Sequence, residues 1–307
     1  MATAFLHHPA CLLHDMGGHH PESPGRLRAI EDRLVASGMM QALKVEVAPA
    51  ATREQLARVH DEAYLDLISE ISPDRGLAYL DADTSMNPHS FSAALHASGA
   101  AVRATDLVIG GGAGNAFCNI RPPGHHACRA RAMGFCLFNN VAVAAAHALD
   151  EHGLERVAIV DFDVHHGNGT EDIFAGDPRV MMVSTFQHPF YPYSGTEGRS
   201  DRMINIPLAA HSRGAEFRAA VEGFWLPALH DFAPQMIFIS SGFDAHRDDD
   251  MAGLGLVEED YAWVTERIME VASRSASGRI VSVLEGGYDL PSLARSAEAH
   301  IRQFCTS

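Results

Sequence analysis

The segment Asp161–Gly169 combines carboxylate and imidazole side chains at a spacing that suits a metal ion. It follows Val157-Ala158-Ile159-Val160, a short apolar and β-branched run that is typical of a buried strand. Asp163 and His165 are two residues apart, so both side chains point to the same side of an extended backbone. A carboxylate oxygen and an imidazole nitrogen on one side form half of a Zn²⁺ site. The segment therefore predicts metal binding directly after a buried strand.

Three other segments also carry reactive side chains directly after apolar, strand-like runs; they are Arg121–His126, Ser240–His246 and Leu284–Asp289. Because ligands bind beyond the carboxyl ends of the strands in an open α/β sheet, all four segments predict one shared site. Asp163, His165 and Asp244 would supply three ligands and leave one position for water, as catalytic zinc sites require.

The remaining reactive side chains fit metal-assisted hydrolysis. His125 and His126 could transfer protons beside that water. The hydroxyl of Tyr288 could donate a hydrogen bond to a developing oxyanion. Asp161 could orient one of the histidines by accepting its N–H. Taken singly, each side chain would more often be a turn, cap or core residue, but four such segments in one chain favour a reactive site.

The elements that must position this site alternate between strand-like and helical patterns. This order predicts an α/β fold with a mainly parallel sheet covered by helices on both faces. Residues 1–307 form a single predicted domain, because no repeat or linker divides them. The predicted strands are Ala4–Leu6, Ala116–Ile120, Val157–Phe162, Val180–Phe186, Met236–Ser241 and Ile280–Leu284. The predicted helices are Pro24–Ser37, Glu62–Ile71, His89–Leu107, Leu137–His152, Ala215–Phe232, Glu258–Ser273 and Pro291–Phe304.

Composition excludes several classes of protein. The formal net charge of −16 repels nucleic acid phosphates, so no nucleic acid partner is expected. No apolar run is long enough to cross a bilayer and no signal peptide is evident, which predicts a cytoplasmic protein without a membrane partner. Five cysteines without a C-x-x-C pair predict neither a disulfide framework nor a structural zinc cluster.

These segments resemble the zinc-dependent histone deacetylase family, which has the arginase/deacetylase fold. The family order is kept across almost the whole chain, in the motifs His20–Pro24, Arg121–His126, Gly134–Asn140, Asp161–Gly169, Ser241–Asp244 and Glu285–Tyr288. The compact size and Asn168 look most like bacterial members related to class II deacetylases and to acetylpolyamine amidohydrolases.

The resemblance implies a role for each matching side chain. Asp163, His165 and Asp244 fall at the zinc-ligand positions, although Fe²⁺ suits the same ligands. His126 falls at the general base and acid, and His125 at a position of electrostatic support. Asp161 falls at the position of the residue that partners His125, and Asn168 at the position of the residue that partners His126. Tyr288 falls at the position of the oxyanion-stabilising tyrosine. Because Asn168 is neutral where many members carry aspartate, the pKa of His126 should be lower than in those members.

Further positions match the substrate and potassium sites of the family. The substrate positions are Gly134, Phe135, Tyr191, Met251, Asp83 and Arg26. Phe135 and Tyr191 would wall a narrow tunnel with Met251 at its mouth and Asp83 on its rim, and Arg26 would line an inner cavity for released acetate. One potassium site would use Asp161, Asp163, His165, Ser184 and Thr185, and a second the backbone oxygens of Phe174, Asp177 and Val180.

The resemblance predicts removal of acetyl or other short acyl groups from lysine side chains, with one Zn²⁺ per chain and bound K⁺. An acylated polyamine is the alternative substrate, although Met251 stands where polyamine-selective relatives can carry a glutamate. An arginase-like two-metal hydrolase is disfavoured, because Gly167 and His246 occur where its second metal needs carboxylates. The complete set of reactive residues disfavours a non-catalytic acyl-lysine binder. No oligomeric state is predicted.

Overall fold

A parallel sheet forms the centre of the computed structural model, which describes residues 1–197 and 200–306. Its strand order is β2-β1-β5-β10-β9-β6-β7-β8, and every neighbouring pair is parallel. The strands are β1 Thr3–His7, β2 Leu43–Val47, β5 Asn115–Cys118, β6 Val157–Asp161, β7 Val180–Gln187, β8 Met203–Leu208, β9 Met236–Ser241 and β10 Ile280–Leu284. β3 Ala78–Tyr79 and β4 Ser85–Met86 form a separate antiparallel pair. The predicted α/β fold with a mainly parallel sheet is confirmed.

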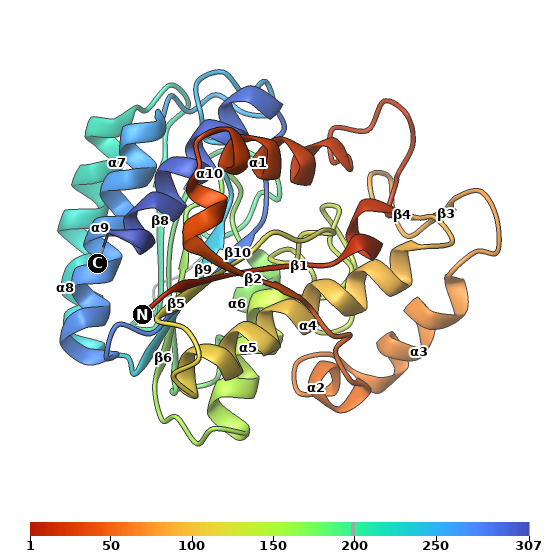
Figure 1. Cartoon of the computed structure of the whole chain (residues 1–307), viewed down its shortest axis with the longest axis horizontal. Helices are drawn as coiled ribbons and strands as arrows, with labels where there is room; N and C mark the ends of the chain where they lie inside the picture. Colours follow the sequence, from red (N-terminus) through yellow and green to blue (C-terminus); the bar gives the residue numbers. More distant parts are fainter. Residues whose placement is uncertain (198–199, 307) are drawn as a thin grey trace.

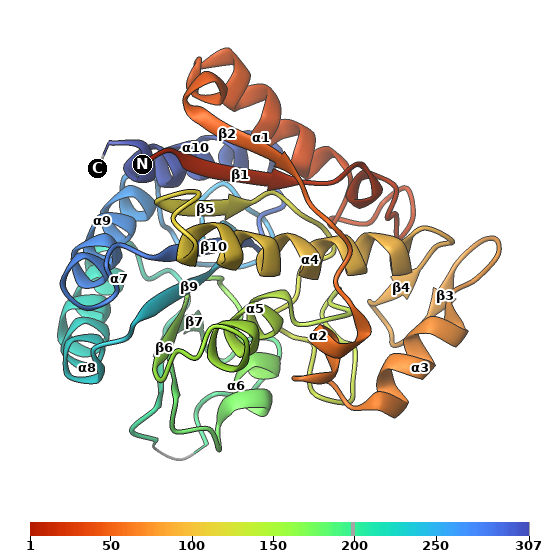
Figure 2. The same ribbon diagram turned by 60° about the horizontal axis from the view of Figure 1, so that its bottom comes forward.

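Helices cover both faces of this sheet (Figures 1 and 2). α4 and α5 pack on one face, and α1, α10 and α9 form a row over the other. The helices are α1 Gly25–Ala36, α2 Arg53–Ala57, α3 Glu62–Ile71, α4 Ser90–Ile109, α5 Asn140–Asp150, α6 Asn168–Phe174, α7 Gly214–Ala220, α8 Leu226–Phe232, α9 Glu258–Ser275 and α10 Leu290–Cys305. Covering both faces explains why the central strands are almost continuously apolar.

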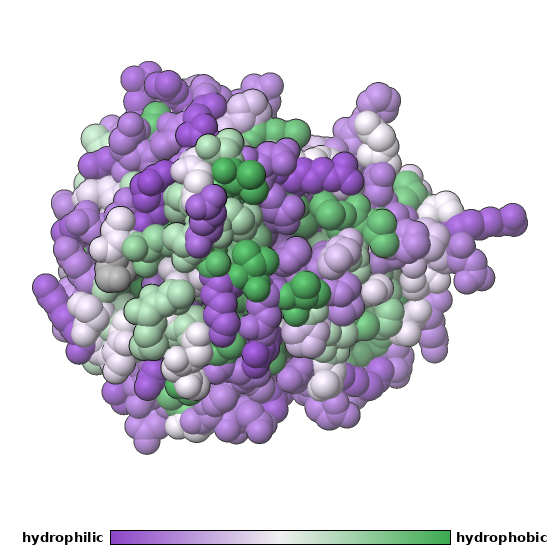
Figure 3. Space-filling model, viewed as in Figure 1, coloured by the Kyte–Doolittle hydropathy of each residue, from purple (hydrophilic) through white to green (hydrophobic). Residues whose placement is uncertain are grey.

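The surface is mainly hydrophilic on the face that Figure 1 presents, with small groups of apolar side chains among the polar ones (Figure 3). Among the described residues, no helix combines the length and the apolarity that crossing a bilayer would need.

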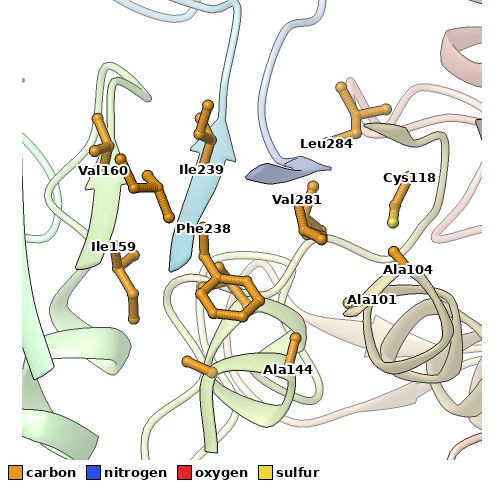
Figure 4. Packing of buried hydrophobic residues seen from close by; sticks show 14 of the residues in the cluster. Ala101, Ala104, Cys118, Ala144, Ile159, Val160, Phe238, Ile239, Val281 and Leu284 are labelled. Atoms are coloured by element: carbon orange, nitrogen blue, oxygen red, sulfur yellow. The ribbon is translucent and has the colours of Figure 1, made fainter. Parts of the chain in front are cut away.

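The core lies between the sheet and its helices, as Figure 4 shows from close by. Ile159 of β6 and Phe238 of β9 are register partners and point toward Ala144 of α5. The next pair, Val160 and Ile239, points to the opposite face. This alternation buries every residue of β6 and β9.

The strand order brings the reactive segments together. β5, β10, β9, β6 and β7 are consecutive in the sheet and parallel, so the loops that follow them meet at one edge.

Several predicted boundaries were wrong, and four strands were missed, namely β2 and β8 of the central sheet and the short pair β3 and β4. The missed strands β2 and β8 form the two edges of the sheet and are only partly buried, so neither has a continuous apolar run. The helix predicted to start at Leu137 begins at Asn140, because the side chain of Asn139 accepts a hydrogen bond from Ala142 N at 3.1 Å and caps it. The helix predicted over Ala215–Phe232 is α7 and α8 joined by a π-helical turn at Val221–Trp225. α6 and the short α2 were also missed.

Candidate active site

The side chains predicted to bind metal meet at the carboxyl edge of the sheet. Asp163 and His165 follow β6, and Asp244 follows β9, its neighbour in the sheet. Each offers one ligand atom, and these atoms lie within 4.8 Å of one another. His165 Nδ1 is 2.9 Å from Asp163 Oδ1 and 3.3 Å from Asp244 Oδ2. All three residues are buried, so the group is shielded from bulk water.

The donor atoms of this group fit a divalent cation. Asp244 Oδ1 accepts a hydrogen bond from Val164 N at 3.0 Å, whereas the buried Asp244 Oδ2 has no hydrogen-bond partner. Burial and the nearby Asp163 carboxylate raise the pKa of Asp244 to about 6. Two buried carboxylates this close call for a compensating positive charge. With the imidazole of His165 they form a nitrogen and oxygen ligand set that Zn²⁺ accepts.

Gly286 leaves the space that these carboxylates occupy. A Cβ atom at this position would lie 2.0 Å from Asp244 Oδ2 and 2.6 Å from Asp163 Oδ2. The backbone N–H of Gly286 instead donates to Asp163 Oδ2 at 2.9 Å. Any larger residue would displace at least one of the two carboxylates.

His125 is held by an acidic partner. Its Nδ1 is 2.9 Å from Asp161 Oδ2, so this nitrogen carries the proton and donates it. Burial opposes protonation of the ring, but the carboxylates of Asp163 and Asp161 outweigh it and raise the pKa of His125 well above its usual value. His125 is therefore suited to electrostatic support rather than to accepting a proton.

His126 has a neutral partner and the opposite protonation behaviour. Its Nδ1 is 2.7 Å from Asn168 Oδ1, while Asn168 Nδ2 faces Cys128 Sγ at 3.4 Å and Met133 Sδ at 3.3 Å. Because the amide oxygen only accepts, His126 Nδ1 carries the proton and its Nε2 is free to accept another. Burial, His125 and His165 lower the pKa of His126 well below its usual value. The hydrogen bond with Asn168 raises this pKa, so burial and the neighbouring imidazoles, rather than the amide, are the main causes of the low value.

Tyr288 lines the same cavity as His126 and His165, and contacts with two other side chains hold it in place. Its backbone N–H donates to Asp249 Oδ2 at 2.6 Å, and the guanidinium of Arg26 lies 4.9 Å from the centre of its ring. Burial raises the pKa of Tyr288 well above its usual value, so the phenol keeps its proton and can donate it in a hydrogen bond.

A cavity of about 200 Å³ connects this group to the surface. Nine residues line it: Asp83, His126, Gly134, Phe135, His165, Phe190, Tyr191, Met251 and Tyr288. Five of them were predicted as substrate contacts. Sequence analysis missed Phe190, whose ring stacks on that of His165 at 5.5 Å. The aromatic pair Phe190-Tyr191, just after an apolar strand, was the available signal.

Arg26, the remaining predicted substrate contact, is fully buried behind Tyr288 and does not line this cavity. Its Nε donates to Gly287 O at 2.6 Å. It also forms an ion pair with the buried Glu22 at 3.0 Å. Its predicted role in acetate release stays a prediction.

Glu285 is a second residue whose place in the site was missed. It is fully buried, and its Oε2 accepts hydrogen bonds from Gly124 N at 2.6 Å and His125 N at 3.1 Å. Burial raises the pKa of Glu285 to about 7. The Glu285–Tyr288 motif marks this residue in the sequence. The motif does not predict that the Glu285 carboxylate accepts hydrogen bonds from the backbone of Gly124 and His125.

The first group of predicted potassium positions shares Asp161, Asp163 and His165 with the site, and the second begins at the end of α6. Ser184 and Thr185 are in β7 beside Asp161 of β6, and the buried Ser184 Oγ has no hydrogen-bond partner. In the second group the oxygens of Phe174 and Asp177 accept turn hydrogen bonds from Asp177 N and Val180 N. Neither arrangement tests whether K⁺ binds, so both sites stay predictions.

Comparisons with known proteins match this chain over nearly all its length. A model of the histone deacetylase domain matches residues 20–304. A histone deacetylase-like amidohydrolase of Pseudomonas aeruginosa is 38% identical over 93% of this chain and 81% of that protein. Histone deacetylase 14, chloroplastic, of Arabidopsis thaliana is 37% identical over 92% of this chain and 72% of that protein. The crystal structure of the HDA15 HD domain has a TM-score of 0.94 at 33% identity, covering 99% of this chain and 90% of that one.

Proposed function

The chain belongs to the histone deacetylase family, and from this premise we propose that it removes acetyl or other short acyl groups from lysine side chains in proteins or peptides. Family membership makes it a hydrolase of amide bonds. One observation carries the finer proposal: His126, His165 and Tyr288 line the same cavity. A base, a metal ligand and an oxyanion donor can thus reach one bound amide.

Asp163, His165 and Asp244 would hold one divalent cation, with Zn²⁺ as the proposed metal. When bound, it would polarise the amide carbonyl and lower the pKa of a water molecule.

His126 and Tyr288 would supply the remaining chemistry. His126 Nε2 would take the proton of the attacking water, because Asn168 holds the other ring nitrogen in its protonated form. The hydroxyl of Tyr288 would donate to the oxyanion of the tetrahedral intermediate. His126 would then give its proton to the departing nitrogen, which leaves as the neutral lysine amine, while the second proton of the water stays with the carboxylic acid product. His125, held in its charged form by Asp161, would add positive charge close to the developing oxyanion.

The shape of the cavity supports a lysine substrate. Phe135 and Tyr191 offer apolar walls for the four methylene groups of a lysine, and Met251 lies near its mouth. Asp83 is exposed at the same cavity, where its carboxylate would accept a hydrogen bond from the substrate backbone.

An acylated polyamine is the second candidate, and carboxylates around the mouth favour it. Asp248, Asp250 and Asp289 line an adjoining cavity of about 250 Å³ that also reaches Met251 and Tyr288. Asp81 lies with Asp83 beside Tyr191 on another side. These carboxylates would attract a cationic amine, but they would equally attract a basic peptide.

Comparing substrates tests the proposal. Metal-loaded enzyme should be assayed with an acetyl-lysine peptide, longer acyl-lysine peptides and acetylputrescine. A kcat/KM at least about tenfold higher for the peptide, equal to 1.4 kcal/mol in transition-state binding, would support lysine deacylation. The reverse order would favour the polyamine, and turnover of neither would contradict both.

A further inference from the structure

A second group of metal-ligating side chains lies outside the active site. Asp106 is in the last turn of α4, His147 is in the last turn of α5, and His152 lies just beyond α5. Asp106 Oδ1 is 2.8 Å from His147 Nε2 and 2.8 Å from His152 Nε2. One ligand atom from each residue lies within 4.8 Å of the others. The two imidazole rings meet edge to face at 5.1 Å.

We propose that Asp106, His147 and His152 bind a second divalent transition-metal cation, of which Zn²⁺ is the probe of choice. Two imidazole nitrogens and a carboxylate oxygen suit Zn²⁺, Cu²⁺ and Ni²⁺ far better than Mg²⁺ or Ca²⁺. In a tetrahedral zinc site neighbouring ligand atoms are about 3.3 Å apart. The two nitrogens would therefore move away from Asp106 Oδ1 by only about half an ångström, and water would complete the coordination.

The surroundings favour a cation at this place. The carbonyl ends of α4 and α5 both lie here, and helix carboxyl ends carry partial negative charge. The side chain of His147 is 6% exposed, against 24% for His152 and 37% for Asp106. The group is therefore partly shielded yet open to a metal ion from solution.

Arg58 competes with a metal ion for His147. Its Nη1 is 2.7 Å from His147 Nδ1, and because arginine only donates, this nitrogen accepts and the ring proton sits on Nε2. Metal binding at Nε2 needs the other tautomer, with the proton on Nδ1. Arg58 can give up its hydrogen bond to His147 and keep the one to Glu151, to which its Nη2 already donates at 3.1 Å. Removing the guanidinium should therefore strengthen metal binding.

This site is separate from the catalytic one. The opposite end of α5 supports the catalytic segment, where Asn140 Nδ2 donates to Pro122 O at 3.1 Å. A cation at the carboxyl end would join α5 to α4 and stabilise the folded chain by mass action. The chain would then bind two divalent cations, one of them outside the active site, in place of the single divalent cation predicted from the sequence.

The test is the zinc content of the full chain after dialysis against dilute Zn²⁺, measured by elemental analysis. Wild type should retain two equivalents, His152→Ala one, Asp244→Ala one, and the double variant none. His230→Ala removes an exposed histidine outside both groups and should retain two. An arginase-like pair of metals would instead share Asp244, and Asp244→Ala would then lose both.

Two further readouts separate binding from folding. Zn²⁺ should raise the melting temperature of Asp244→Ala but not of the double variant, and Arg58→Ala should bind the second equivalent about tenfold more tightly. A single equivalent in wild type, or a second equivalent that survives His152→Ala, would overturn the proposal. Neither outcome bears on deacylation, because Asp106, His147 and His152 lie outside the cavity that would bind the acyl group.

Discussion

Each reactive side chain of the site has a neighbour that fixes its direction or its protonation. Asp161 holds His125 in a form that stays charged, whereas Asn168 leaves His126 neutral with Nε2 free. Two adjacent histidines therefore have different chemistry, because carboxylates outweigh burial at His125, whereas burial and the neighbouring imidazoles prevail at His126.

Removing the hydroxyl of Tyr288 should slow the chemical step. In Tyr288→Phe the oxyanion loses one donor, so kcat should fall by about 10²–10³ while the zinc content stays that of wild type. Steady-state kinetics together with elemental analysis checks this. Wild-type turnover in Tyr288→Phe would refute the oxyanion role.

Filling the space at Gly286 should disrupt the metal ligands without unfolding the chain. Its Cβ would lie 2.0 Å from Asp244 Oδ2, so Gly286→Ala should weaken catalytic zinc binding by about 10–100-fold. Gly223→Ala is the matched control, because a Cβ there meets no atom within 4 Å. Zinc titrations of both variants decide this, and equal affinities would show that the carboxylates can move aside.

At this scale the sequence predicted the reactive residues but not all of their supports. Asp163, His165 and Asp244 were predicted as ligands because their types and their positions after strands are visible in the sequence, and the structure brings them together. Glu285 acts on backbone N–H groups of a segment 160 residues away, which no local pattern reveals. Arg26, predicted to line an inner cavity, lies against the ring of Tyr288 and outside the cavity described above, so its role stays a prediction.

At the scale of elements, the buried strands were predictable and the edges were not. Ile280–Leu284 and Met236–Ser241 are uniformly buried, so their apolar runs gave their bounds. β2 and β8 are partly exposed edge strands, and their mixed sequences match no strand pattern. The start of α5 depends on a cap at Asn139, which is a three-dimensional contact.

A buried ion cluster joins α1 to the loop after β5. Glu22 precedes α1, and its Oε1 is 3.0 Å from Arg26 Nη1 in that helix. Its Oε2 is 2.6 Å from Nη2 of Arg121, in the loop after β5. Glu22→Gln would leave two buried guanidinium groups without their anion and should cost about 3–5 kcal/mol of unfolding free energy. Denaturant titration measures this, with the exposed Glu62→Gln, expected to change stability little, as control.

The buried carboxylate of Glu22 also makes the stability of the folded chain depend on pH. Burial opposes its ionisation, but Arg121, His14 and Arg26 outweigh burial and hold the pKa of Glu22 well below its usual value of 4.5. Its contribution to stability is therefore complete above about pH 4.5 and is lost as the pH falls toward the lower folded-state pKa. The difference in unfolding free energy between wild type and Glu22→Gln should therefore shrink as the pH falls. A difference that stays constant with pH would contradict this.

At the scale of the whole molecule, the net charge of −16 should select among substrates. Carboxylates around the mouth would steer cationic peptides to the cavity, so at low salt kcat/KM should be about tenfold higher for an acetyl-lysine peptide with basic flanks than with neutral flanks. This preference should shrink as salt screens the field. A preference that is independent of salt would point to direct contacts instead.

The central claim is that Asp163, His165 and Asp244 bind one cation at which an acyl-lysine amide is cleaved. The most direct measurement is mass spectrometry of an acetyl-lysine peptide incubated with zinc-loaded wild type and with Asp244→Ala. Wild type should release the free lysine peptide and acetate in equal amounts, and Asp244→Ala should release neither. Deacetylation by Asp244→Ala at the wild-type rate would contradict the account.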